Sequence, residues 1–352
     1  MIRRRATVGV AAVGVVAGAV ALGFVAAPAG AGQSPSLPPT TPAALVQSVL
    51  TAKLPAMSGT VEIDNNLGLP AVPGLPAQAA NGTSQVRVWT DGNERTRIAI
   101  PGPNSEQTIV DTGTTVYAWD STDRTVVEHS VREGQQHAKQ QLDQRDIDPA
   151  TAAKDLVGAV QATSTVTVDG TDIVAGRPAY DLVLTPKPAE RTLLREVRIS
   201  VDAQTRMPLR LTVLSDNTDT PAVQVGFTSV QLGRQDPSLF RFTVPAGATV
   251  VNGDKHDDQP AKITDAARPT VVGSGWDTVL VAHVPTGSSA KGNGSGQMSG
   301  MVRQFGTPVH GSWGSGWVIG TSVGNALITS DGRVAVGFVP QQVLIQALGG
   351  GK

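Results

Sequence analysis

Cysteine is absent from the chain, which removes disulfide bridges, thiol catalysis, cysteine-based metal sites and an acylated lipoprotein cysteine. Aromatic residues make up only 4% and charged residues 16%, whereas glycine and proline number 39 and 24. Few bulky side chains and many turn formers indicate short strands, long loops and a thinly filled core. With a net charge of −1 and no Lys/Arg run after residue 5, the chain lacks the basic footprint of a nucleic-acid-binding protein.

Residues 1–32 have the features of an export signal. Arg3, Arg4 and Arg5 form a positive start, and an uncharged Ala/Val/Gly run continues to about Ala27 before small residues that fit a cleavage site. The run is also long enough to span a bilayer, so an uncleaved anchor is the alternative to cleavage. In either case we expect the body of the protein to be exported, either secreted or held in the cell envelope.

Most of the chain after a Ser/Pro/Thr linker at 33–41 reads as short strands. Alternating apolar residues predict three strands within 176–215, because a period of two places one apolar set on one face of a sheet. Capping residues and apolar stripes predict helices over 42–52 and 148–161. Further strands are expected at 58–65, 84–90, 94–100, 105–111, 114–120, 124–130, 164–174 and 222–232.

About eleven antiparallel strands must curl, and a curled sheet with helices in its concavity leaves an apolar groove. Residues 236–240 predict a helical turn, and 242–247 a closing strand. A charged linker over 252–269 separates the predicted body at 42–251 from a smaller α+β segment at 270–352. There we expect strands at 278–283, 312–320, 325–329 and 334–338 and a helix at 341–348, with a Gly/Ser-rich stretch at 287–300.

An apolar Pro/Gly segment, Leu67 to Gly82, interrupts the strands and is too rich in proline to be one. It is either a surface loop or an apolar flap over the mouth of a cavity.

The pattern Gly176-x-x-Ala179-Tyr180-x-Leu182-x-Leu184-x-Pro186, a hairpin through Asp202 and Pro208, and the segments 225–230 and 240–247 together resemble the LolA-like superfamily. That group includes periplasmic lipoprotein carriers, mycobacterial lipid-carrying lipoproteins and regulators of the RseB type. The resemblance covers 42–251 and implies an incomplete, half-open antiparallel β-barrel whose hydrophobic cavity is closed by helices and binds acyl chains. The fold class expected is therefore α+β, with a small C-terminal extension.

Two departures from the family pattern limit what the resemblance implies. The Gly/Ala-rich start looks like that of the actinobacterial branch, where a shuttle to a Gram-negative outer membrane would have no destination. The missing cysteine also separates this chain from membrane-anchored lipid carriers. The segment 270–352 resembles an extension of actinobacterial members.

The residues expected to line a lipid cavity are the apolar positions of the predicted strand faces and helix stripes. An ordinary packed core is the alternative interpretation of the same pattern. The set is Leu45, Val49, Val86, Val88, Ile98, Ile100, Leu156, Val160, Tyr180, Leu182, Leu184, Val197, Ile199, Val201, Leu209, Leu211, Val213, Val225 and Phe227.

Motifs for catalysis or metal binding are weak. Gly320 to Gly324 matches G-x-S-x-G around Ser322, but a nucleophile elbow needs a helix directly after the serine, and a strand-like stretch follows here. The five histidines show no metal-ligand spacing, and His256 lies in a charged linker. We expect no catalytic residue, no metal and no cofactor.

The main functional hypothesis is thus an exported, non-enzymatic carrier that holds a lipid or an acylated lipoprotein. The first alternative is an RseB-like sensor whose C-terminal segment contacts a membrane protein partner, an anti-sigma factor. The second alternative is a serine hydrolase that uses Ser322.

Overall fold

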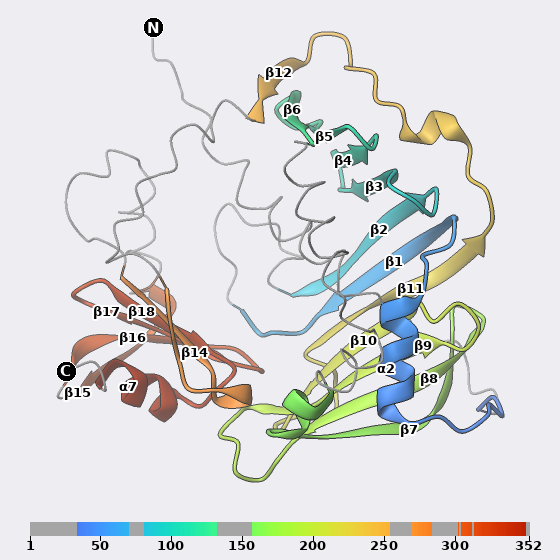
Figure 1. Ribbon diagram of the computed structural model, residues 1–352. Helices are drawn as coiled ribbons and strands as arrows, with labels where there is room; N and C mark the ends of the chain where they lie inside the picture. The colour runs from blue at the N-terminus through green and yellow to red at the C-terminus, as the bar shows by residue number, and fades with distance from the viewer. Residues whose placement is uncertain are drawn as a thin grey trace, which may run out of the picture.

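The computed structural model describes residues 34–69, 81–131, 157–253, 269–283, 302, 304–311 and 313–349. They form two sheets, one of twelve strands and one of six, with the smaller sheet packed beside one end of the larger (Figure 1). No helix within these residues is long and apolar enough to cross a membrane.

The large sheet is open, with β7 and β12 at its two edges and the order β12-β6-β5-β4-β3-β2-β1-β11-β10-β9-β8-β7. All neighbours are antiparallel except β12, which runs parallel to β6. This confirms the expected α+β fold with a large antiparallel sheet that does not close into a barrel. The strands are β1 (Met57–Asn65), β2 (Gly82–Thr90), β3 (Thr96–Pro101), β4 (Glu106–Asp111), β5 (Thr115–Asp120), β6 (Thr125–Ser130), β7 (Ser164–Val174), β8 (Arg177–Pro186), β9 (Leu194–Asp202), β10 (Pro208–Ser215), β11 (Val223–Leu232) and β12 (Thr249–Asn252).

One helix, α2 (Pro42–Thr51), packs on this sheet. The Thr41 hydroxyl caps it by accepting from the Ala44 N–H at 3.2 Å, and Pro42 occupies a first-turn position where no N–H is needed. The helix buries Leu45 against Tyr180 and Leu182 of β8. The helix predicted over 42–52 is confirmed. Of the helix predicted over 148–161, residues 157–161 are helical and the rest lies outside the described residues.

We define the inner face of the large sheet as the face that α2 covers, and the outer face as the opposite one. Register places one apolar row on each half of the inner face, the first from β7 to β1 and the second from β2 to β6. One row is Val168, Leu182, Ile199, Leu211, Val225 and Ile63. Another row is Val88, Ile98, Ile109, Ala118 and Val127.

The outer face of β3–β6 is covered by the segment that follows β11. This segment contains the 3-10 helix η1 (Pro237–Phe240), which buries Phe240, and Phe242 stacks on Tyr117 with ring centroids 4.9 Å apart. The closing strand predicted over 242–247 is wrong. Pro245 has no backbone donor and the Phe242 ring packs on the sheet, so pairing begins only at β12.

The six-stranded sheet has the order β13-β14-β18-β17-β16-β15 and carries a helix on one face. The predicted strands are found within two residues of the expected bounds, whereas β13 and β15 were not predicted. The elements are β13 (Thr270–Val272), η4 (Gly275–Asp277), β14 (Val279–His283), β15 (Thr307–Gly311), β16 (Gly314–Gly320), β17 (Asn325–Thr329), β18 (Arg333–Gly337) and α7 (Gln341–Gly349).

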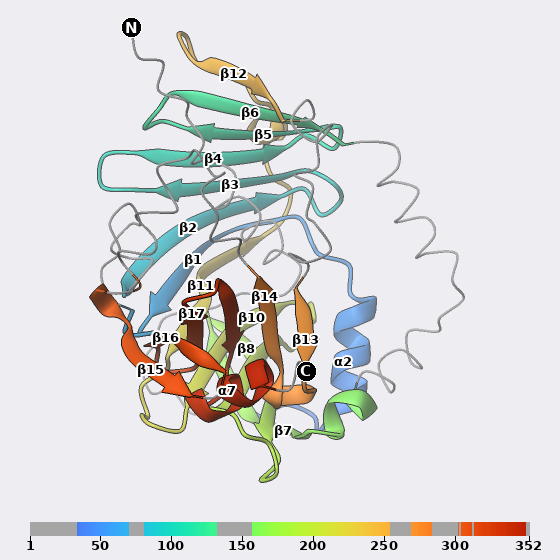
Figure 2. The same ribbon diagram turned by 90° about the vertical axis from the view of Figure 1, so that its left-hand side faces the viewer.

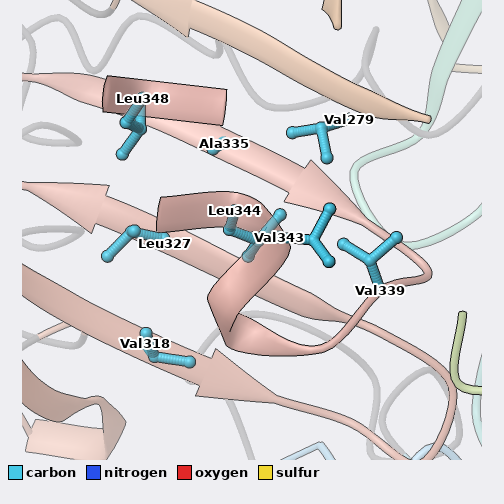
Figure 3. Close-up of a cluster of buried hydrophobic side chains, with 8 residues drawn as sticks. All are labelled: Val279, Val318, Leu327, Ala335, Val339, Val343, Leu344 and Leu348. Atoms are coloured by element: carbon cyan, nitrogen blue, oxygen red, sulfur yellow. The ribbon is translucent and has the colours of Figure 1, made fainter. Parts of the chain in front are cut away.

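The core of this second sheet lies between its strands and α7. Val343, Leu344 and Leu348 of the helix point toward Leu327 and Ala335, and Val279, Val318 and Val339 complete the cluster (Figure 3). The segment therefore has an apolar core of its own.

Candidate functional site: the inner face and its seam with the second sheet

The inner face is most densely packed where α2 lies. Leu45, Tyr180, Leu182, Val166 and Val201 form one buried cluster. The extended chain before the helix is fixed to the same strands, since the Tyr180 hydroxyl donates to the Pro38 carbonyl at 2.9 Å and the Thr171 hydroxyl to the Pro35 carbonyl at 2.7 Å. The position of α2 on β7–β9 is thus set by both apolar packing and hydrogen bonds.

The residues expected to line a cavity are divided by the structure between packed core and partly exposed surface. Leu209, Phe227 and Val201 are fully buried, so their side chains are core. Leu45, Ile98, Tyr180 and Leu182 are also buried, and Leu156 lies outside the described residues. The members that remain half-buried are Val49, Val86, Val88, Ile100, Val160, Leu184, Val197, Ile199, Leu211, Val213 and Val225.

A second cluster of the sheet is centred on the Phe227 ring, with Met57 and Val61 beside it. Gly59 makes room for this ring, because a Cβ at Gly59 would lie 2.6 Å from it. Val86, Val88 and Val225 pack around the cluster but retain exposed surface. The inner face of β1 and β2 therefore has a buried cluster around Phe227 and, packed against it, apolar side chains that remain partly exposed.

The β9–β10 turn beside α2 is held by a buried ion pair between Arg177 and Asp202. Burial raises the pKa of Asp202, but the Arg177 guanidinium and the N–H groups of Thr205 and Gln204 outweigh it, and the pKa falls below its ordinary value. The Arg206 guanidinium of the same turn lies 5.3 Å from the centre of the Tyr180 ring. These contacts stiffen the end of the sheet that carries α2.

The outer face of β7–β10 is polar. The Ser200 hydroxyl donates to Asp181 at 2.6 Å, and Arg210 pairs with Asp172 at 2.5 Å. Burial raises the pKa of Asp181, and the Ser200 hydrogen bond offsets only part of this effect. The outer face of β7–β10 therefore carries charged pairs, whereas the inner face of the same strands carries apolar side chains.

Two hollows lie away from the inner face. One, of about 550 Å³, is formed by the β2–β3 and β4–β5 turns, including Asp91, Glu94 and Thr112. The other, of about 200 Å³, lies beside it against Arg234 and Phe240. Asp91 there is already engaged by Arg95 and by the Asn93 N–H. Neither hollow is lined by the apolar residues expected for a lipid cavity.

The two sheets meet in a seam of direct hydrogen bonds. The Phe338 carbonyl accepts from the Leu193 N–H at 2.9 Å and from the Thr192 hydroxyl at 2.7 Å. Arg191 pairs with Asp277 at 2.8 Å. At the other side of the seam the Ser322 hydroxyl donates to the Asn66 carbonyl at 3.1 Å, and its N–H donates to the Leu67 carbonyl at 2.9 Å.

Beneath these bonds the seam is apolar. Leu194, Ala222 and Val323 are buried together, with Leu67, Val213 and Trp276 packed against them. The Trp276 indole N–H donates to the Ser164 hydroxyl of β7 at 2.7 Å. Because Val213 belongs to the inner face, the seam begins where that face ends.

The seam also explains the G-x-S-x-G motif. Strand β16 precedes Ser322 and strand β17 follows at Asn325, so the helix that a nucleophile elbow requires is missing at this place. Within the described residues, which include His129, His283 and His310, no three His, Asp or Glu side chains come together as metal ligands.

Sequence reasoning missed the seam and the cover of the outer face. Both are contacts between segments far apart in the chain, such as Ser322 with Asn66 and Phe242 with Tyr117. The pair Phe240 and Phe242, in a chain poor in aromatics, was the one available signal for the outer cover. Of the Leu67–Gly82 segment, the structure describes the two ends, and residues 70–80 lie outside the described residues. The ends are joined by a hydrogen bond from the Gly68 N–H to the Asn81 side chain at 2.8 Å.

Comparison with known proteins gives structural matches only. No family model and no curated protein matches the chain. Structure comparison finds MucB of Pseudomonas aeruginosa, in a structure with MucA, at 16% identity and a TM-score of 0.42, covering 86% of this chain and 94% of that one. It also finds an uncharacterised conserved protein of Thermus thermophilus at 12% identity and a TM-score of 0.35, covering 59% and 96% of the two chains.

A LolA superfamily protein of Nitrosomonas europaea matches at 13% identity and a TM-score of 0.24, covering 58% of this chain and 99% of that one. Likeness of this degree concerns the fold alone. The structural neighbours found in this way include MucB and a protein of the LolA superfamily.

Proposed function

We propose that the protein is an exported, non-enzymatic carrier that binds a lipid or lipoprotein acyl chain on the inner face of its large sheet. The observation that carries the proposal is the division of the two faces. Each half of the inner face carries an apolar row, whereas the outer face has charge pairs on β7–β10 and is covered on β3–β6.

Packing uses only part of the inner face. Within the described residues, α2 and the helical residues 157–161 lie on it, and both Leu45 and Val160 pack against the cluster over β7–β9. Side chains further along, such as Val86, Ile100 and Leu211, keep exposed surface. Each methylene buried against such a surface contributes about 0.8 kcal/mol, so an acyl chain would bind without any catalytic or ionic group.

Native mass spectrometry of the full-length, delipidated protein with palmitic acid tests the proposal. We expect a bound fatty acid in the wild type and weaker binding in Ile109→Asn, which places an amide on the half-buried inner face. Arg87→Asn is the matched control, because Arg87 lies exposed on the outer face of β2, which is separated from β4 by β3. Wild-type protein that takes up neither palmitic acid nor phospholipid contradicts the proposal.

The seam favours one alternative, a sensor of the RseB kind that contacts a membrane anti-sigma factor. Hydrogen bonds from Ser322 to Asn66 and Leu67 link the second sheet to the start of the Leu67–Gly82 segment. The sensor would be favoured if the wild type pulls down an anti-sigma factor from membranes. A seam variant that still binds palmitic acid should then fail to pull it down. Esterase activity that Ser322→Ala abolishes would instead support a hydrolase.

A further inference from the structure

A hollow of about 200 Å³ lies where three segments meet at one end of the large sheet. Its walls come from Ala56 before β1, from the β2–β3 turn and from the segment after β11. The strands β3–β6 beside it lie away from the second sheet in both views (Figures 1 and 2). None of the seam residues and none of the residues expected to line a lipid cavity contributes to the hollow, so it is a separate feature.

The three segments are held together by contacts of their own backbones. The Gly233 N–H donates to the Ala56 carbonyl at 2.8 Å, which fixes the segment after β11 to the start of β1. Gly92 in the β2–β3 turn has a φ of +80°, and a Cβ there would lie 2.7 Å from the Ala56 nitrogen. Glycine therefore lets this turn approach the start of β1 closely, and the fold fixes the walls of the hollow.

The Arg95 guanidinium lines the hollow and is held from one side. Its Nε donates to Asp91 Oδ2 at 2.7 Å, and it lies 5.5 Å from the centre of the Phe240 ring. Burial raises the pKa of Asp91, but the Arg95 side chain and the N–H groups of Asn93 and Arg95 outweigh it, and the pKa falls below its ordinary value. Asp91 is thus a fixed carboxylate, and the two terminal nitrogens of Arg95 have no hydrogen-bond partner within the described residues.

A second guanidinium, that of Arg234, lines the same hollow. Arg234 is exposed, and among the residues that the structure describes it has no hydrogen-bond or ion-pair partner. Asp91 is the single carboxylate in the lining, and Arg95 already uses it. The hollow therefore carries one uncompensated positive charge, and an anion between the two guanidinium groups would remove their mutual repulsion.

We propose that this hollow binds a terminal phosphate group, with the Arg95 and Arg234 guanidinium groups as donors. A guanidinium donates through a planar fork that matches one edge of an oxyanion, so a single arginine satisfies the two oxygens of a carboxylate. A terminal phosphate has three acceptor oxygens and a charge of about −1.5 to −2 at pH 7, and it can accept from both arginines. Phe240 is buried beneath Arg95, so this ring offers no surface to a nucleotide base. The ligand class is a small phosphate, either inorganic phosphate or the glycerol phosphate of a lipid head group.

Isothermal titration calorimetry of the full-length protein with inorganic phosphate and with glycerol phosphate, at constant ionic strength, tests this inference. We expect the wild type to bind at least one of them, and Arg234→Gln to lower that affinity about tenfold, because the charge-assisted hydrogen bonds of one guanidinium are lost. Arg234 is exposed, so the fold should persist, as circular dichroism and Tm will show. Arg87→Gln is the matched control, since Arg87 is an exposed arginine of the outer face that does not line the hollow.

Wild-type protein that binds neither phosphate compound overturns the inference, and so does equal affinity in Arg234→Gln and the wild type. Acetate that binds as tightly as phosphate, with the same dependence on Arg234, overturns the phosphate assignment in favour of a carboxylate. Tighter binding of glycerol phosphate than of inorganic phosphate supports a lipid head group as the source, and the reverse order supports free phosphate. Palmitic acid binding should stay unchanged in Arg234→Gln, so this inference and the proposed function fail independently.

Discussion

The two halves of the large sheet are covered by other segments on different faces. In β7–β9 a helix covers the inner face, where Tyr180 and Leu182 meet α2. In β3–β6 the segment after β11 covers the outer face. Val110 and Val126 of this face are fully buried, and Phe242 of that segment stacks on Tyr117. Within the described residues, packing thus covers the inner face over β7–β9 and the outer face over β3–β6. What remains apolar and half-buried is the inner face of the other half.

Phe240→Ala should have the largest effect, since it removes the buried ring of the outer cover. Deleting a buried Phe side chain costs about 4 kcal/mol of unfolding free energy, measured by urea denaturation. Palmitic acid binding, normalised to folded protein, should not change. Val244→Ala, exposed in the same segment, should change stability by less than about 0.5 kcal/mol. Equal losses of stability in Phe240→Ala and Val244→Ala would contradict the claim that the segment after β11 stabilises the outer face of β3–β6.

Leu45→Ala breaks the inner packing instead. Truncating this buried leucine should cost about 3 kcal/mol and release α2 from β7–β9, which limited proteolysis near residues 42–51 will detect. Leu50→Ala on the same helix is the control, because Leu50 is exposed. Protease resistance that survives Leu45→Ala would mean that the hydrogen bonds to Pro35 and Pro38 hold the segment by themselves.

Asp202→Asn weakens the turn that borders α2 by removing the carboxylate that pairs with Arg177. We expect a loss of about 2 kcal/mol at pH 7, since hydrogen bonds to charged groups are involved. The pKa of Asp202 is lowered in the folded state, so its contribution is present above the unfolded value of about 3.9 and disappears as the pH falls through the lower folded value. The difference in unfolding free energy between wild type and variant should therefore stay constant from pH 7 to about pH 5 and shrink as the pH falls below about 3.9.

Asp181→Asn should have the smallest effect and the opposite sign. Burial raises the pKa of this carboxyl on the outer face, so its charge opposes folding at neutral pH. The variant can keep the Ser200 hydrogen bond, and we expect Tm to rise by about 2 °C at pH 7. The gain should shrink as the pH falls through the raised pKa, because wild-type Asp181 is then neutral as well. A lower Tm at pH 7 would show that the outer face needs this charge.

Local pattern was sufficient to predict most strands and α2. Alternation within 180–184 and 197–201 and the Thr41–Pro42 cap are local signals, and the elements they predict are confirmed. The parallel strand β12 and the edge strands β13 and β15 escaped prediction because three to five residues next to proline or glycine carry too little periodicity.

The candidate site was predictable only in part, for a different reason. A period of two identifies the inner-face set but does not distinguish a packed core residue such as Phe227 from a half-buried one such as Val86. That distinction depends on which segment covers each strand. The cover on β3–β6 is more than a hundred residues away in the chain, and the seam through Ser322 joins residues 256 positions apart.

Because the chain has no cysteine, single introduced cysteines can report separately from the two faces. An environment-sensitive dye on Ile109→Cys, of the inner face, is compared with the same dye on Arg87→Cys, of the outer face, during titration with palmitic acid. The account predicts a blue shift at position 109 that saturates, and none at position 87. No shift at 109, or equal shifts at both positions, would contradict it.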